Sequence, residues 1–112
     1  MEMTVQPVGD GIQKVSLNGV FDIEGAADVD LHFAALAGAE KKILVDLSAV
    51  TALASIGIRT LLVNAKVVKR RGGTFVLAGA QPMVDRVLQT AGIGELIPLY
   101  PDADSAMAAF EG

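Results

Sequence analysis

One hydroxyl stands among apolar residues in the segment TALASIGIR, residues 51–59. Ser55 comes directly before Ile56, where an apolar pattern with helical spacing begins. A serine at a helix start can accept a hydrogen bond from a backbone N–H two or three residues further on, or it can be presented at the surface as a functional residue. The local pattern by itself favours the first interpretation, in which Ser55 caps the helix.

No other residue type in the chain suggests that Ser55 is a catalytic nucleophile. The single histidine, His32, falls on a predicted alanine-rich helix, where a surface position is commoner than a catalytic one. Four acids, Asp22, Asp28, Asp30 and Asp46, lack the spacing of a calcium loop, and His32 has no accompanying metal ligand. We therefore predict a protein that is not an enzyme and has no metal and no cofactor.

The glycines and the basic residues point to structural roles. Gly57 is isolated, and Gly72-Gly73 follows a predicted helix, whereas a phosphate-binding loop would precede one. The segment KVVKRR, residues 66–71, concentrates basic side chains near the end of that helix, where they complement the negative end of the helix dipole. We prefer this interpretation to a phosphate-binding patch.

Composition narrows the function classes. The chain has 112 residues, 52% hydrophobic content and a mean hydropathy of +0.49, enough for one compact domain over residues 1–112. A net charge of −4 does not favour direct nucleic-acid binding, which depends largely on clustered lysines and arginines. No cysteine occurs, which fits a reducing compartment, and no apolar run reaches the roughly 18 residues of a membrane span. With no signal-peptide pattern at the start, we expect a cytoplasmic protein without membrane insertion.

Strand and helix patterns alternate along the chain. Two strands joined by a Gly-Asp-Gly turn open it as a hairpin, and a first helix then ends at Gly38. The run ILVDL reads as a buried central strand, and Gly72-Gly73 stops the second helix. Pro82 begins a third helix, and Asp102 or Asp104 starts a last one. The expected strands are residues 3–8, 12–20, 43–47, 74–78 and 96–100, and the first helix covers 25–37.

This order predicts an α/β domain with a mostly parallel, mixed β-sheet of about five strands, an N-terminal hairpin and about four helices. Functional sites in such sheets tend to lie beyond the carboxyl ends of strands, where a loop enters the next helix. We therefore expect the site in a loop from Ser48 to Ala54, between the central strand and the second helix. In that loop and helix start, Leu53, Ala54 and Ile56 would form an apolar contact surface.

At this point the chain resembles a known family. The sequence VDLS followed by AVTAL and then ASIGI, residues 45–58, is similar to the STAS domain of bacterial anti-sigma factor antagonists, also called anti-anti-sigma factors. The resemblance extends over nearly the whole chain. It includes LNGVFD at 17–22, GGTFVL at 72–77, VLQTAGI at 87–93 and LIPLY at 96–100. It implies a single STAS-like domain.

The resemblance also implies a partner switch. In this family the unphosphorylated antagonist binds an anti-sigma factor, usually a serine kinase of the histidine-kinase-like ATPase type, and so frees a sigma factor. Phosphorylation at the helix start breaks the complex, and a PP2C-type phosphatase restores it. The positions that match the family's partner-binding surface here are Asp22, Leu53, Ala54, Ser55, Ile56 and Gly57.

The sequence departs from the family pattern at the switch. The family commonly reads Asp-Ser-Ser/Thr-Gly, whereas this chain reads Ala54-Ser55-Ile56-Gly57. The acid and the second hydroxyl are therefore absent, and Ser55 is the one hydroxyl of the motif that could be phosphorylated. Asp22 matches a family position beside the switch, although the local pattern favours an Asx turn that starts the first helix.

Three functions remain open on the sequence alone. The first is an anti-sigma factor antagonist that acts through the Ser55 helix start. The second is a STAS accessory subunit of a lipid-transport ATPase complex, in which Ser55 is never phosphorylated. The third is a small-ligand sensor with a pocket near the loop tips. The missing acid and Ile56 favour the second function, and the short chain favours the first.

Overall fold

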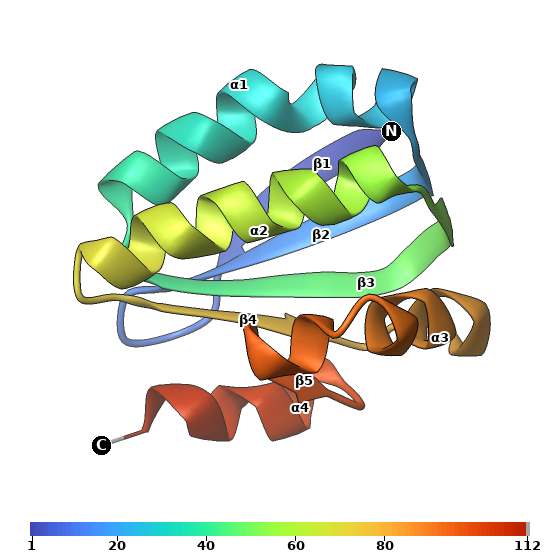
Figure 1. Cartoon of the computed structure of the whole chain (residues 1–112). Coiled ribbons are helices and arrows are strands. Elements are labelled where there is room, and N and C mark those ends of the chain that lie inside the picture. The colour runs from blue at the N-terminus through green and yellow to red at the C-terminus, as the bar shows by residue number, and fades with distance from the viewer. Residues whose placement is uncertain (112) are drawn as a thin grey trace.

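The computed structural model describes residues 1–111. Within them a five-stranded sheet has the order β1-β2-β3-β4-β5, so strands adjacent in sequence are adjacent in space (Figure 1). Only the β1–β2 pair is antiparallel; the other three pairs are parallel. The elements are β1 (Glu2–Pro7), β2 (Ile12–Phe21), α1 (Ile23–Ala39), β3 (Lys42–Leu53), α2 (Ser55–Arg70), β4 (Thr74–Ala78), α3 (Pro82–Thr90), η1 (Ile93–Glu95), β5 (Leu99–Tyr100), α4 (Ala103–Ala106) and η2 (Met107–Phe110). The predicted mixed α/β fold with an N-terminal hairpin is confirmed.

The two faces of the sheet carry two apolar clusters. Alternate residues of a strand point to opposite faces, so Ile43 and Val45 of β3 pack with α1, α2 and α3, whereas Leu44 packs under α4 and η2. The first cluster is much the larger. Because α1 and α2 lie side by side over it, their N-termini emerge together at the carboxyl ends of β2 and β3 (Figure 1).

The sequence predicted a loop from Ser48 to Ala54, and this prediction is wrong. β3 continues to Leu53, and its second half pairs with β2, so that Leu53 lies opposite Phe21. β4 ends at Ala78, opposite Asp46. The second half of β3 therefore pairs with β2 and, within the described residues, has no strand on its other side. The buried Val50 anchors it to the core. A strand followed by the single residue Ala54, and not a flexible loop, therefore carries the start of α2.

Other boundaries differ by little from the sequence prediction. α1 runs one residue past Gly38, to Ala39, and the last strand keeps only Leu99–Tyr100 of the predicted 96–100. Asp102, and not Asp104, caps the C-terminal helix: its carboxylate accepts a hydrogen bond from Ser105 N at 2.7 Å. The second half of that helix is a 3-10 segment.

Within residues 1–111, none of the helices is both long and apolar enough to cross a membrane.

Candidate functional site

Ser55 is the first residue of α2 and is exposed to solvent. The N-cap position belongs to Ala54, which has extended backbone angles of φ −97° and ψ 169°. Gly57 N and Ile58 N both donate to the Ala54 carbonyl oxygen, which fixes the first turn one residue earlier than predicted. The interpretation of Ser55 as the helix cap is therefore wrong. The reason is tertiary: Ala54 N donates to Phe21 O at 2.9 Å and holds Ala54 to the end of β2.

This helix start is left open by the protein. The first N–H groups of an α-helix have no acceptor inside the helix, and a side chain usually supplies one. Among the described residues, no side chain caps α2. The positive end of the helix dipole and its free N–H groups therefore face solvent beside the Ser55 hydroxyl.

Asp22 occupies the corresponding position on the neighbouring helix and has a different function. Its carboxylate accepts a hydrogen bond from Gly25 N at 2.9 Å and caps α1. The prediction of a turn-forming, helix-starting aspartate is confirmed. Because Phe21 O accepts the bond from Ala54 N, Asp22 lies next to the α2 start, and the two helix N-termini form one surface at this edge.

Gly57 lies beneath this surface rather than on it. It is buried, and a Cβ placed on it would lie 2.8 Å from the Leu53 side chain, from the Phe21 ring and from Phe21 O. Such distances are too short for a real Cβ. Glycine at this position lets the first turn of α2 approach the end of β2, so Gly57 positions the site without being available for contact.

The predicted apolar surface is present, and it is larger than the motif suggested. Ala54 is exposed, and Leu53 and Ile56 are half-buried. Two large apolar side chains that the sequence analysis did not select extend the same sheet edge: Ile23, 76% exposed after the α1 cap, and Met83, 72% exposed in the first turn of α3. A signal in the sequence could have identified them: each comes directly after a helix start, at a position that does not belong to the buried face of its helix.

Neighbouring polar residues hold the sheet edge in place. Asp46 accepts a hydrogen bond from Ser48 N at 2.9 Å and pairs with Lys14 at 3.5 Å, so it is a structural acid. The Gln81 side chain donates to Ser48 O at 2.8 Å and fastens the β4–α3 connection to β3. His32 lies exposed on α1. The described residues contain no group of three or more acidic, histidine or cysteine side chains placed to hold a metal ion.

The basic cluster at the end of α2 divides into two roles. Arg71 donates from Nη1 to Ala37 O at 2.8 Å and to Glu40 O at 2.9 Å, so it caps the C-terminus of α1. As predicted, Lys69 and Arg70 lie in the last turn of α2, at the negative end of its dipole, whereas Arg71 serves the neighbouring helix. Lys66 and Lys69 are exposed.

Comparison with known proteins places the chain in a family. The family model described as STAS domain matches residues 5–106, and the chain belongs to this family. The curated relative "Putative anti-sigma factor antagonist BtrV" of Bordetella bronchiseptica is 28% identical over 112 residues, with 99% of this chain and 96% of the relative covered.

Two solved structures have the same fold. An anti-sigma factor antagonist from Mycobacterium paratuberculosis superposes with a TM-score of 0.85 at 28% identity, over 96% of this chain and 92% of that one. A protein from Thermotoga maritima gives a TM-score of 0.88 at 23% identity, again over 96% and 92% of the two chains. The STAS fold expected from the sequence is confirmed.

Proposed function

We propose that this protein is an anti-sigma factor antagonist. In this proposal it acts in the cytoplasm and binds an anti-sigma factor through the surface formed by the starts of α1 and α2, and so releases a sigma factor. The names of the relatives support this function, and so does the apolar surface around Ala54 and Ile56, which suits a protein contact. The protein acts by binding and not by catalysis.

We further propose that phosphorylation of Ser55 switches the contact off. The observation that carries this proposal is the uncapped α2 start, with Ser55 exposed at its first position. A phosphate adds about −1.5 to −2 charges, which the N–H groups and dipole of a helix N-terminus accommodate. The same charge next to Ile56 would have to be desolvated in an apolar interface, which is costly. One modification can therefore leave the fold intact and remove the partner.

The partner that fits this proposal is an anti-sigma factor that is itself a serine kinase of the histidine-kinase-like ATPase type. A PP2C-type phosphatase would reverse the modification. The motif lacks the family's acid, because Ala54 stands in its place. Kinase recognition must then rely on the open helix start and the surrounding apolar side chains.

The test is intact-protein mass after incubation with each candidate anti-sigma kinase from the source genome, ATP and magnesium. One added phosphate on the wild type, absent from Ser55→Ala, supports the switch. Thr51→Ala is the matched control, because Thr51 is an exposed hydroxyl four residues away on β3 and its loss should change nothing. Phosphate on Thr51, or on another residue, would contradict the assignment of Ser55.

Binding separates the two parts of the proposal. In a calorimetric titration with the anti-sigma factor, Ser55→Asp should weaken binding, and Ser55→Ala should form a complex that ATP no longer dissociates. If both variants bind and dissociate like the wild type, the switch is wrong but the antagonist function stands. If no candidate anti-sigma factor binds the wild type, the antagonist function itself is wrong.

A further inference from the structure

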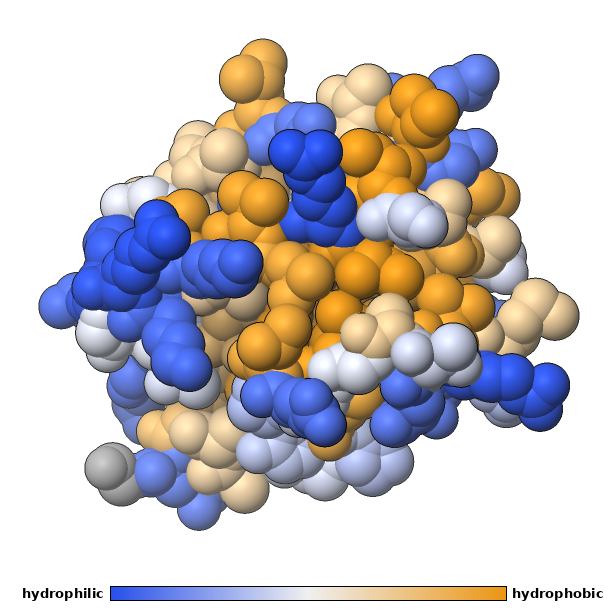
Figure 2. Space-filling view, in the orientation of Figure 1, coloured by the Kyte–Doolittle hydropathy of each residue, from blue (hydrophilic) through white to orange (hydrophobic). Residues whose placement is uncertain are grey.

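A groove lies away from the Ser55 site, between α2 and the chain that passes through η1 to Pro98. It consists of two adjoining depressions of about 200 Å³ and about 170 Å³, which share Ala65, Lys69 and Leu96 in their walls. Figure 2 shows hydrophobic residues gathered in this part of the molecule. We call it the α2–η1 groove, and its apolar lining is Leu62, Ala65, Phe75, Leu96, Ile97 and Pro98.

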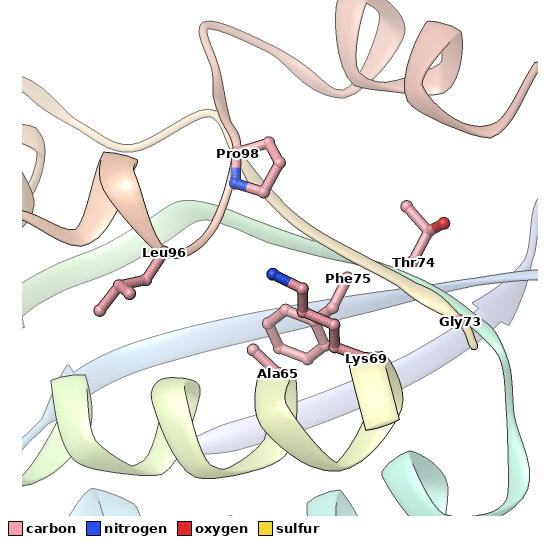
Figure 3. Close-up of a pocket in the computed structure, with 7 residues that line it drawn as sticks. All are labelled: Ala65, Lys69, Gly73, Thr74, Phe75, Leu96 and Pro98. Carbon is pink, nitrogen blue, oxygen red and sulfur yellow. The ribbon is translucent and has the colours of Figure 1, made fainter. Parts of the chain in front are cut away.

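Two lysines border this apolar groove. Lys66 and Lys69 both line it and are exposed, and among residues 1–111 neither forms an ion pair. Figure 3 shows the Lys69 side chain extending from α2 toward the groove, in the neighbourhood of Phe75 and Pro98. The α2 sequence contains four basic residues and no acidic one. The complementary surface is therefore an apolar side chain flanked by carboxylates.

The outer face of α1 has this character. Glu24, Asp28 and Leu31 stand at i, i+4 and i+7, on one face of the helix. Leu31 is 89% exposed, the highest value among the large hydrophobic residues of the described chain. Ala27 and Ala35 flank it and are small enough to let a partner approach closely. α1 contains no lysine or arginine, and one oxygen of Asp28 binds the Met1 ammonium group at 2.7 Å.

These two complementary surfaces cannot meet within one chain. α1 lies on one side of α2 and the groove lies on the other (Figure 1). We propose that the α1 outer face of one copy docks into the α2–η1 groove of a second copy, with Leu31 as the anchor and Glu24 facing Lys66 and Lys69. The contact is heterologous, head to tail, so the copy that docks through α1 keeps its groove free and the other copy keeps its α1 face free for a further copy.

The dimensions and charges fit this contact. The larger depression, at about 200 Å³, exceeds the roughly 150 Å³ cavity that holds a benzene molecule, so it has room for a leucine side chain. The proposed ion pairs between Glu24 and the two lysines lie at the surface, where salt at about 1 M reduces the electrostatic screening length to about 3 Å. Association should therefore increase with protein concentration and decrease with added salt. The groove uses the C-terminal half of α2, so the contact does not depend on Ser55.

The experiment is sedimentation velocity of the full chain over a series of concentrations at low and high salt. For the wild type at low salt, the weight-average sedimentation coefficient should rise with concentration, and high salt should reduce the rise. Leu31→Ser should abolish the rise. The matched control is Ala34→Ser, an exposed α1 residue beside this face, which should associate like the wild type. Ser55→Asp should also behave like the wild type.

A charge exchange tests the geometry. Glu24→Lys gives a basic face and a basic groove, and the double variant Lys66→Glu, Lys69→Glu gives an acidic face and an acidic groove. Each should stay monomeric alone, and an equimolar mixture should associate again, because each α1 face then meets a groove of opposite charge. All the substituted residues are exposed, and circular dichroism with thermal unfolding verifies that each variant is folded.

Three results would overturn the proposal. The first is a wild type that remains monomeric at every concentration at low salt. The second is association that survives in Leu31→Ser or in the acidic-groove double variant, which would place the contact elsewhere. The third is a mixture of the two charge variants that stays monomeric although each is folded.

Discussion

The starts of α1 and α2 are adjacent in the fold, yet they are built in opposite ways. α1 begins at Asp22, whose carboxylate closes the helix by accepting the hydrogen bond from Gly25 N. The N-cap of α2 is Ala54, which has no such group, and Ser55 is exposed directly after it. Both helices follow strands that end at the same edge. The two starts therefore differ in one respect: the first turn of α1 is closed by a side-chain cap, and the first turn of α2, where we propose that a phosphate is received, is not.

The largest expected effect concerns the glycine that lets the open helix start approach the sheet. Gly57→Ala should destabilise the protein by about 1–3 kcal/mol, the usual range for overpacking, because its Cβ would press on Phe21 and Leu53. Urea unfolding measures this. Gly38→Ala is the matched control: it lies in α1, its added Cβ would meet no atom within 4 Å beyond the adjoining residues and the helix's own backbone, and it should stabilise by about 0.5–1 kcal/mol. Equal effects of the two changes would contradict the packing argument.

Removal of the cap should affect the closed helix. Asp22→Ala should cost about 1 kcal/mol of stability, within the 0.5–2 kcal/mol range for loss of an N-cap, because Gly25 N loses its acceptor. Thermal unfolding provides the measurement, and Asp22→Asn, which keeps an acceptor oxygen, should recover most of the loss. A loss of equal size in Asp22→Asn would show that the charge, and not the capping hydrogen bond, matters.

Addition of a cap should close the open helix. Ala54→Asp should stabilise the protein by about 0.5–1 kcal/mol, because a carboxylate at the N-cap accepts a free N–H and complements the dipole. Chemical denaturation measures this gain. Ala49→Asp, an exposed position within β3, should give no gain. If Ala54→Asp is neutral or destabilising, the α2 start is not the open N-terminus described above.

The smallest expected effect concerns the start of α4, which Asp102 caps, and it depends on pH. The hydrogen bond from Ser105 N holds the pKa of Asp102 below its ordinary value of 3.8. The folded state therefore favours the ionised form, so the contribution to stability is present above pH 3.8 and is lost as the pH falls through the lower, folded-state pKa. Urea midpoints of the wild type and Asp102→Asn should differ at neutral pH and converge in acid. A constant difference would contradict this assignment.

The sequence predicted the α/β class, the hairpin and the order of elements correctly, because local patterns carry that information. Alternating apolar residues mark buried strands, and glycines mark the ends of helices. Asp22 was also predictable as a helix start, because an aspartate at that position needs only its own next turn to form the cap. Leu53, Ala54 and Ile56, the apolar residues next to Ser55 in the chain, were identified as well, but Ile23 and Met83 were not.

The sequence did not reveal that β3 extends through Ser48–Leu53, that Ala54 and not Ser55 is the N-cap, or that Gly57 is buried. Each of these depends on β2, more than 25 residues earlier in the chain, because pairing with Phe21 draws the strand onward and fixes where the helix begins. The apolar groove with its two lysines is also assembled from distant segments. The sequence thus determined which residues are available and which elements form. Only the tertiary structure decided which helix start has no cap, because long-range strand pairing outweighs the local preference of a serine to cap.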